Sequence, residues 1–315
     1  MSKVTIPVID ISGYLNNDKE KTKDIVNSLH AAFQNPGFLQ ITGHAISASL
    51  RSATLSALSS FFSLPLETKL TVHRNKSSCL RGYEVIGEQT LEAAVGGDQK
   101  EGFMIGPELP ETGRFLQGPN QWVAEELCPG FREIFMEYFS AVHGLSVKVF
   151  RLVALSLELS EGYFDRFVGS KDSIAMCRAH RYPPTTKEMA TKTRGIGAHT
   201  DFGALTLLLQ DEVGGLEVYY EPDDIWYPVP YVPDAFVVNI GDMLERWTNN
   251  RYKSTRHRVI SPVSDRDRYS IAFFNEGLLD QVITCIPTCV EEAEEPLHEP
   301  ITAEQHLRNR YGGTY

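Results

Sequence analysis

The sequence contains little cysteine, with 5 residues among 315, and no Cys-x-x-Cys pair. An odd number of scattered cysteines fits free thiols in a reducing compartment better than a disulfide framework. The N-terminus also lacks a long apolar leader, and no apolar run of membrane-spanning length is apparent. We therefore expect a cytoplasmic protein without a membrane partner.

Clusters of basic residues are missing as well. Lys and Arg together number 30 against 41 Asp and Glu, which gives a formal net charge of -11. A protein that binds a phosphate backbone needs a basic face, and no Lys/Arg run of that kind occurs. We therefore expect a small-molecule substrate and no nucleic-acid partner, whereas the oligomeric state is not predicted.

The first part of the chain contains alternating strand and helix patterns. Residues 6–11 and 38–42 are typical of short strands, and residues 22–35 and 47–62 have apolar positions at helical spacing. Residues 75–120 are rich in Gly, Pro and polar side chains. Long irregular connections of this kind often form lids or binding loops.

The second part of the chain shows a different pattern, with one long predicted helix followed by short predicted strands. A long amphipathic helix is predicted over residues 131–159, with apolar positions that keep the 3.6-residue period. Short β-prone runs separated by Gly, Pro, Asp and Asn then follow at residues 175–182, 202–210, 215–220, 236–239, 257–259 and 268–275. Many short strands suggest a barrel or a jelly roll. With no repeat or linker to divide the chain, a single α+β unit is favoured.

A histidine and an aspartate stand two residues apart, at His199 and Asp201, directly before an apolar run. Side chains at i and i+2 of an extended segment point the same way, so both can reach one point. His257, at the start of another β-prone run, is the best candidate for a third ligand. Two imidazoles and a carboxylate are typical of non-haem Fe(II) sites, although zinc accepts the same ligands. An isolated His-x-Asp pair would more often be structural.

Arg268 and Ser270 follow His257 with the same i, i+2 spacing. A guanidinium binds a carboxylate through two hydrogen bonds, and a serine hydroxyl can add a third. This pair suits the far carboxylate of a dicarboxylic cosubstrate whose other end chelates the metal. Taken alone, Arg268 would more often form a surface salt bridge.

Other motifs accompany these two along almost the whole chain: residues 37–41, 44, 81–83, 98–102, 180–183, 214–218, 238–242, 253–259 and 268–274. With them the sequence resembles the Fe(II)- and 2-oxoglutarate-dependent dioxygenases of the isopenicillin-N-synthase-like family. The resemblance implies an α+β fold: a double-stranded β-helix (jelly roll) core flanked by helices, with an N-terminal helical region and a C-terminal helix. Residues 1–315 would form a single catalytic unit. Residues 1–120 would be the N-terminal family region with lid loops, 121–160 the long supporting helix, and 171–290 the jelly-roll core.

The resemblance also assigns roles to residues. It implies that Fe(II) is bound by His199, Asp201 and His257. It implies that the distal carboxylate of 2-oxoglutarate is bound by Arg268, Ser270 and Tyr182. Many plant relatives carry an asparagine where this chain has His180, so His180 either donates a hydrogen bond to the cosubstrate or packs as a strand residue.

Substrate contacts are predicted at Arg178, Tyr83 and Phe274. Arg178 lies two residues before His180 on the same predicted strand face, and the other two occupy positions that often border the family's pocket. Asn239 and Asp242 follow an apolar strand, and turn chemistry is the preferred explanation for both. The remaining histidines, at positions 30, 44, 73, 143, 298 and 306, are expected to be structural or solvated.

The activity that the resemblance implies is O2-dependent oxidation of a small organic substrate in secondary metabolism, with release of succinate and CO2. The outcome would be hydroxylation, or alternatively desaturation or cyclisation. Three other functions stay open at this point. They are a 2-oxoglutarate-independent Fe(II) oxidase of the same fold, a catalytically silent binding module, and a zinc hydrolase that uses the same three ligands.

Overall fold

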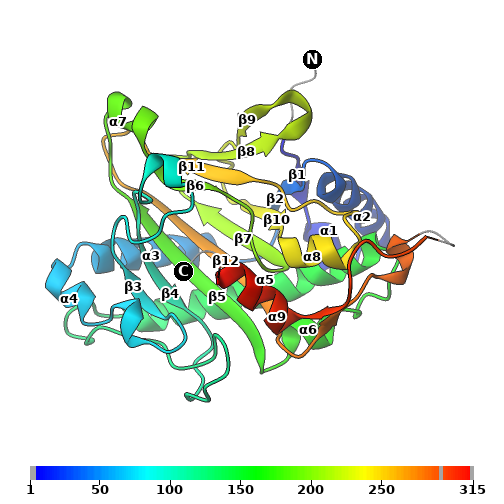
Figure 1. Ribbon diagram of the computed structural model, residues 1–315, viewed down its shortest axis with the longest axis horizontal. Coiled ribbons are helices and arrows are strands. Elements are labelled where there is room, and N and C mark those ends of the chain that lie inside the picture. The colour runs from blue at the N-terminus through cyan, green and yellow to red at the C-terminus, as the bar shows by residue number, and fades with distance from the viewer. Residues whose placement is uncertain (1–4, 291–293, 313–315) are drawn as a thin grey trace.

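Two β-sheets form the core of the computed structural model, which describes residues 5–290 and 294–312 (Figure 1). The larger sheet contains, in spatial order, β1 (Val8–Asp10), β2 (Phe38–Thr42), β10 (Phe236–Ile240), β7 (Leu205–Gln210), β12 (Arg268–Leu278), β5 (Ser173–Tyr182), β4 (Glu101–Ile105) and β3 (Gly82–Glu84). The smaller sheet contains β6 (Arg194–His199), β11 (His257–Ile260), β8 (Leu216–Tyr220) and β9 (Ile225–Pro228). A hairpin-like pair, β13 (Val282–Ile283) and β14 (Ile301–Thr302), lies apart from both.

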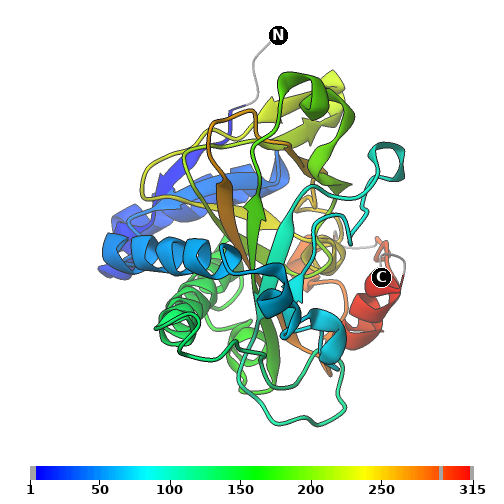
Figure 2. The same ribbon diagram turned by 90° about the vertical axis from the view of Figure 1, so that its left-hand side faces the viewer.

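Helices cover one face of the larger sheet. α2 (Lys19–Gln34), α3 (Ala48–Phe62) and α5 (Phe131–Ser156) pack together there, and α5 contacts β7 and β12 (Figures 1 and 2). α9 (Ala303–Tyr311) lies on the opposite side of the sheet from α3 (Figure 2). The shorter helices are α1 (Ser12–Leu15), α4 (Leu66–Leu70), α6 (Asp165–Gly169), α7 (Lys187–Lys192) and α8 (Asp242–Trp247).

Helix α5 is the longest helix of the described chain, and its composition explains its position. By length and composition alone it could cross a membrane, with a mean hydropathy of 1.3 over its most apolar window. More than half of that window is buried inside the protein, where it contacts α2, α3 and the larger sheet. The apolar length of α5 is therefore accounted for by packing in the core.

Strand β12 shows how the larger sheet separates its core from a cavity. Alternate side chains on one face line the cavity: Arg268, Ser270, Ala272, Phe274 and Glu276. Side chains between them point the other way, and Phe273 packs on Phe139 of α5 with ring centroids 5.5 Å apart. The two-residue period of a strand thus gives β12 one face for the helices and one for the cavity.

The predicted α+β fold with a jelly-roll core, N-terminal helices and a C-terminal helix is confirmed. All five cysteines are free thiols, as expected. The predicted strand over residues 202–210 begins only at Leu205. The structure also contains strands that were not predicted, among them β3 and β4 within residues 75–120 and β9 after β8. His199 ends β6 in the smaller sheet, and β7 belongs to the larger sheet. The His-x-Asp motif therefore lies where the chain crosses from one sheet to the other.

Candidate active site

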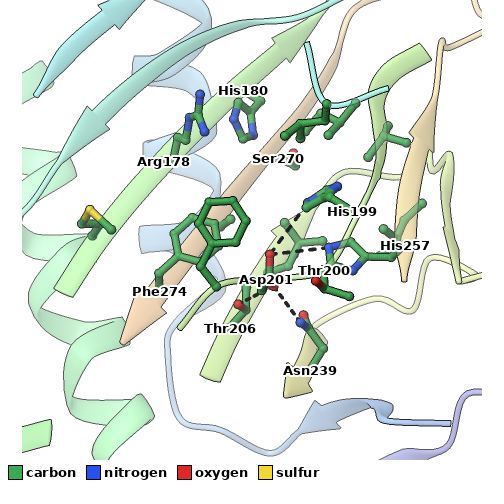
Figure 3. A pocket seen from close by; sticks show the side chains of 18 of the residues that line it. Arg178, His180, His199, Thr200, Asp201, Thr206, Asn239, His257, Ser270 and Phe274 are labelled. Atoms are coloured by element: carbon green, nitrogen blue, oxygen red, sulfur yellow. Dashed lines mark hydrogen bonds and ion pairs between the residues drawn. The ribbon is translucent and has the colours of Figure 1, made fainter. Parts of the chain in front are cut away.

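His199, Asp201 and His257 converge at one end of the smaller sheet (Figure 3). The two histidines are register partners in β6 and β11, and their ring centroids lie 4.3 Å apart. Oδ1 of Asp201 lies 3.8 Å from Nε2 of His199 and 3.6 Å from Nε2 of His257. The three potential ligand atoms all lie within 4.8 Å of one another, a spacing that one metal ion can bridge.

Hydrogen bonds fix which ring nitrogen of each histidine faces this point. Nδ1 of His199 lies 2.8 Å from the carbonyl oxygen of Gly197, and Nδ1 of His257 lies 3.0 Å from that of Thr255. A carbonyl accepts only from a protonated nitrogen, so Nδ1 carries the hydrogen in both rings. Each Nε2 then has a free lone pair, as a metal ligand requires.

Hydrogen bonds also orient the carboxylate of Asp201. Its Oδ2 accepts hydrogen bonds from Thr206 Oγ1 at 2.6 Å and from Asn239 Nδ2 at 2.7 Å. These bonds leave Oδ1 toward the two imidazoles (Figure 3). Asn239 lies on strand β10, so its assignment to turn chemistry was wrong, and it positions a ligand.

The protonation states also suit a metal. Burial and the neighbouring His257 lower the pKa of His199 to about 4, so the ring is neutral at pH 7. Burial raises the pKa of Asp201, but the two histidines and its hydrogen bonds outweigh this effect, and the net shift is downward. Two imidazoles and one carboxylate on a single side form the facial arrangement that suits Fe(II) and leaves other positions open.

A second feature of the cavity is a buried cation without a protein counter-ion. Arg268 is 0% exposed, and it donates hydrogen bonds to Ser270 Oγ at 3.1 Å, to Gln210 Oε1 at 3.2 Å and to the carbonyl of Gly214. Within the described residues, no carboxylate lies at ion-pair distance from its guanidinium. Because a buried charge is costly unless it is paired, this arrangement favours binding of an anionic ligand.

Tyr182 and His180 flank this guanidinium on β5. The Tyr182 ring lies 4.7 Å from Arg268 Cζ, and its hydroxyl lies 3.5 Å from Ser270 Oγ. His180 also lines the cavity, and its buried Nε2 has no hydrogen-bond partner in the described chain (Figure 3). Burial, with Lys100 and Arg178 nearby, holds the pKa of His180 well below its usual value. Of the two roles left open for His180, its position in the cavity favours contact with a ligand.

The three predicted substrate residues have different positions. Phe274 and Arg178 line the cavity, and Figure 3 shows Arg178 beside His180. Arg178 is already paired, because its Nη2 contacts Glu84 and lies 3.0 Å from Gln89 Oε1. Tyr83 is not brought to the cavity. Its ring is buried in the core, and its hydroxyl donates to Glu101 Oε2 at 2.6 Å.

Several cavity residues were not predicted. Besides Asn239 they include Thr200, Thr206, Gln210 and Glu276. Asp242 does not act only in a turn, since its Oδ1 accepts from Ser254 Oγ at 2.6 Å and its Oδ2 pairs with Arg310 at 2.7 Å. The one sequence signal for Asn239 was a polar residue within the otherwise apolar run 236–240.

The irregular segment within residues 75–120 borders the metal site. Gln89 and Leu91 line the cavity. Asp98 Oδ1 accepts a hydrogen bond from the backbone of Gly197 at 3.0 Å, and Glu92 Oε2 accepts one from Ala198 at 3.2 Å. The segment is therefore tied to β6 directly before His199.

Comparisons with known proteins agree with this geometry. Residues 173–277 match the 2OG-Fe(II) oxygenase superfamily, and residues 6–125 match the N-terminal region of the non-haem dioxygenases in morphine synthesis. The chain is 41% identical to the 2-oxoglutarate-Fe(II) type oxidoreductase hxnY of Emericella nidulans, over 100% of this chain and 92% of that protein. It is 36% identical to the clavatol oxidase claD of Penicillium crustosum, over 98% and 96% of the two chains.

A solved structure shares the fold over nearly its full length. A full-length Neurospora crassa protein in complex with alpha-KG (2-oxoglutarate) superposes with a TM-score of 0.89 at 31% identity, covering 98% of this chain and 96% of that one. The same protein with alpha-KG and thymine gives a TM-score of 0.88 at 30% identity, with coverage of 98% and 97%. The chain therefore belongs to the 2-oxoglutarate- and Fe(II)-dependent oxygenase superfamily, in its isopenicillin-N-synthase-like class, and is a dioxygenase that uses Fe(II), 2-oxoglutarate and O2 to oxidise a small substrate.

Proposed function

We propose that this dioxygenase hydroxylates a C–H bond of a compact, ring-bearing substrate. In the balanced reaction, one oxygen atom of O2 enters the substrate as a hydroxyl group. The other enters succinate as 2-oxoglutarate loses CO2. The observation that carries the proposal is the composition of the cavity wall beside the triad.

Apolar and aromatic side chains form part of that wall. Phe202, Phe274 and Tyr311 line the cavity together with Leu208 and Met176. Flat aromatic walls favour a planar ring over a flexible chain.

The similar proteins support this substrate class. The Neurospora crassa protein has been crystallised with thymine and with 5-formyluracil, both of which are small polar rings. The Penicillium crustosum relative is named a clavatol oxidase. A compact ring would also fit the expected role in secondary metabolism, and a cytoplasmic location stays a prediction.

Different residues of the cavity would bind the metal and the cosubstrate. Bound Fe(II) and 2-oxoglutarate would supply the activation of O2. We assign His199, Asp201 and His257 to the metal, with Thr206 and Asn239 holding Asp201 in its orientation. Arg268, Ser270 and Tyr182 would bind the distal carboxylate of 2-oxoglutarate, with His180 beside them. The aromatic wall would hold the substrate ring beside the metal-binding residues.

The test is turnover of ring compounds by the Fe(II)-loaded protein with isotopically labelled O2. We expect succinate formation to rise with a productive substrate, and one labelled oxygen to appear in succinate and one in the product. The Arg268→Ala variant serves as the background. Product formation without succinate would support the 2-oxoglutarate-independent oxidase instead. Absence of stimulation by any compound of a panel of pyrimidines, pyridones and phenols would contradict the proposed substrate class.

A further inference from the structure

Glu276 is a buried acid in the cavity that neither the metal site nor the cosubstrate site uses. It lies on the same face of β12 as Arg268 and Phe274, at the opposite end of that face from Arg268. Its residue is 2% exposed, and its buried Oε2 has no hydrogen-bond partner in the described chain. A buried carboxyl oxygen without a partner is costly, by about 1 to 3 kcal/mol or more. Glu276 therefore needs an explanation beyond packing.

The backbone around Glu276 makes room for its carboxyl group. The carboxyl lies against Gly203, and a Cβ atom at Gly203 would overlap both of its oxygens. Gly203 belongs to the crossover that carries Asp201, so Glu276 is held next to the metal site. The neighbouring side chain on this strand face, in the direction of Arg268, is Phe274, whose ring lines the cavity.

The charges that face Glu276 are acids. Burial, followed by Asp201 and Asp242, raises its pKa to about 8, while Arg310 is engaged with Asp242 at 2.7 Å. At neutral pH the group therefore keeps its proton in the metal-free protein. A neutral carboxyl group offers one hydrogen-bond donor and one acceptor side by side.

We propose that Glu276 is a specificity-determining residue that pairs with a cyclic amide edge of the substrate, meaning an N–H donor adjacent to a C=O acceptor. Lactams, cyclic imides and pyridones carry this edge, and a carboxyl group matches it with two parallel hydrogen bonds. The inference rests on the proposed function, since it takes the substrate ring to lie beside the metal. With the ring against Phe274 and its amide edge on Glu276, substrate and cosubstrate occupy opposite ends of one strand face.

The test uses thymine, which has two N–H groups, and 1,3-dimethylthymine, which has none. Binding of each is measured anaerobically to full-length protein loaded with Fe(II) and 2-oxoglutarate. We expect the wild-type protein to bind thymine about ten-fold or more tightly than its dimethyl derivative, as two net hydrogen bonds would give. Glu276→Met should remove this preference, and Glu276→Gln, which keeps a donor and an acceptor, should restore most of it.

The affinity for 2-oxoglutarate is measured in the same samples and should be equal in all three proteins, which shows that the variants are folded. Equal thymine affinity in wild-type and Glu276→Met protein would overturn the inference, as would undetectable thymine binding by the wild type. Equal losses in the Gln and Met variants would also overturn it, because an ionised carboxylate would then be required. Failure of the wild-type protein to bind 2-oxoglutarate would instead contradict the proposed function.

Discussion

Glu84 and Glu276 are both almost fully buried, at 2% exposure each, but their surroundings are opposite. Glu84 lies among three cations, with Lys100 Nζ at 2.6 Å, Arg74 Nη1 at 2.8 Å and Arg178 in contact. These cations outweigh its burial and hold the pKa of Glu84 far below its usual value. Within the described residues, the charges that shift the pKa of Glu276 are those of Asp201 and Asp242, and together with burial they raise it to about 8.

The two arginines of the cavity repeat this contrast. Arg178 has a carboxylate partner in Glu84, whereas Arg268 donates only to neutral oxygens. In the cluster of Arg74, Glu84, Lys100 and Arg178, here called the Glu84 cluster, every charged group lies at ion-pair distance from an opposite charge. The metal triad, Arg268 and Glu276 have no ion pair with any other Lys, Arg, Asp or Glu side chain within the described residues. The comparison teaches that incomplete charge pairing, and not burial alone, separates the groups that bind ligands from those that support the fold.

The largest expected effect is loss of iron from the incomplete region. His199→Ala removes one of three ligands and should lower iron affinity and turnover by well over 100-fold, since partners that only orient a ligand already account for about 10- to 100-fold. The measurement is iron content after anaerobic reconstitution. His298→Ala, which alters a histidine that is bonded to Asn250 and does not line the cavity, should bind iron normally. Normal iron content in His199→Ala would remove the metal assignment.

A substitution in the Glu84 cluster should lower the stability of the fold. Glu84→Gln leaves three cations without their shared anion, and we expect the free energy of unfolding to fall by about 3 to 5 kcal/mol. Urea unfolding of the metal-free protein measures it. Glu276→Gln should change the same quantity by no more than about 1 kcal/mol or stabilise the protein. Equal destabilisation by both substitutions would erase the distinction between the two regions.

A smaller effect is expected at the residue that orients Asp201. Asn239→Ala removes the hydrogen bond to Oδ2 while leaving all three ligands, so iron affinity should fall by about 10- to 100-fold. Metal titration against a competing chelator measures this change. The exposed Asn309, on α9, provides the matched control, and Asn309→Ala should leave the affinity as it is. A loss as severe as in His199→Ala would mean that Asn239 does more than orient Asp201.

The last expected effect is a dependence of stability on pH. The folded pKa of Glu276, about 8, exceeds its ordinary value of 4.5. As pH rises between these values the unfolded chain releases the proton while the native protein keeps it. The contribution of Glu276 to native stability therefore decreases as pH rises, by up to about 1.4 kcal/mol per unit. Thermal unfolding of metal-free wild-type and Glu276→Gln protein should show this slope only in the wild type. Parallel curves would contradict the raised pKa.

The parts predicted best from the sequence are pairs of residues two positions apart. Arg268 and Ser270 share a direction on the single strand β12, whereas His199 ends β6 and Asp201 lies in the crossover directly after it. Metal binding, carboxylate binding and the reaction class could therefore be predicted from the sequence. The jelly roll followed from the short β-prone runs and from the resemblance.

The residue positions that could not be predicted from the sequence depend on contacts between segments that are distant in the chain. Asn239 meets Asp201 only because β10 pairs with β7, where Asn239 lies opposite Thr206. Tyr83 faces the core because of the register of β3 on β4, which its neighbouring residues do not encode. Glu276 is placed next to the metal site because it packs against Gly203, a residue more than seventy positions away in the sequence.

Binding of 2-oxoglutarate to the Fe(II)-loaded protein tests the central claim most directly. Calorimetry on wild-type, Arg268→Ala and Arg178→Lys proteins compares the unpaired arginine with the paired one. Loss of a charge-assisted anchor should cost about 1.5 to 3 kcal/mol, so Arg268→Ala should bind 2-oxoglutarate roughly 10- to 150-fold more weakly. Arg178→Lys, which keeps a cation beside Glu84, should bind it within about three-fold of the wild type. Unchanged affinity in Arg268→Ala, or an equal loss in Arg178→Lys, would contradict the account.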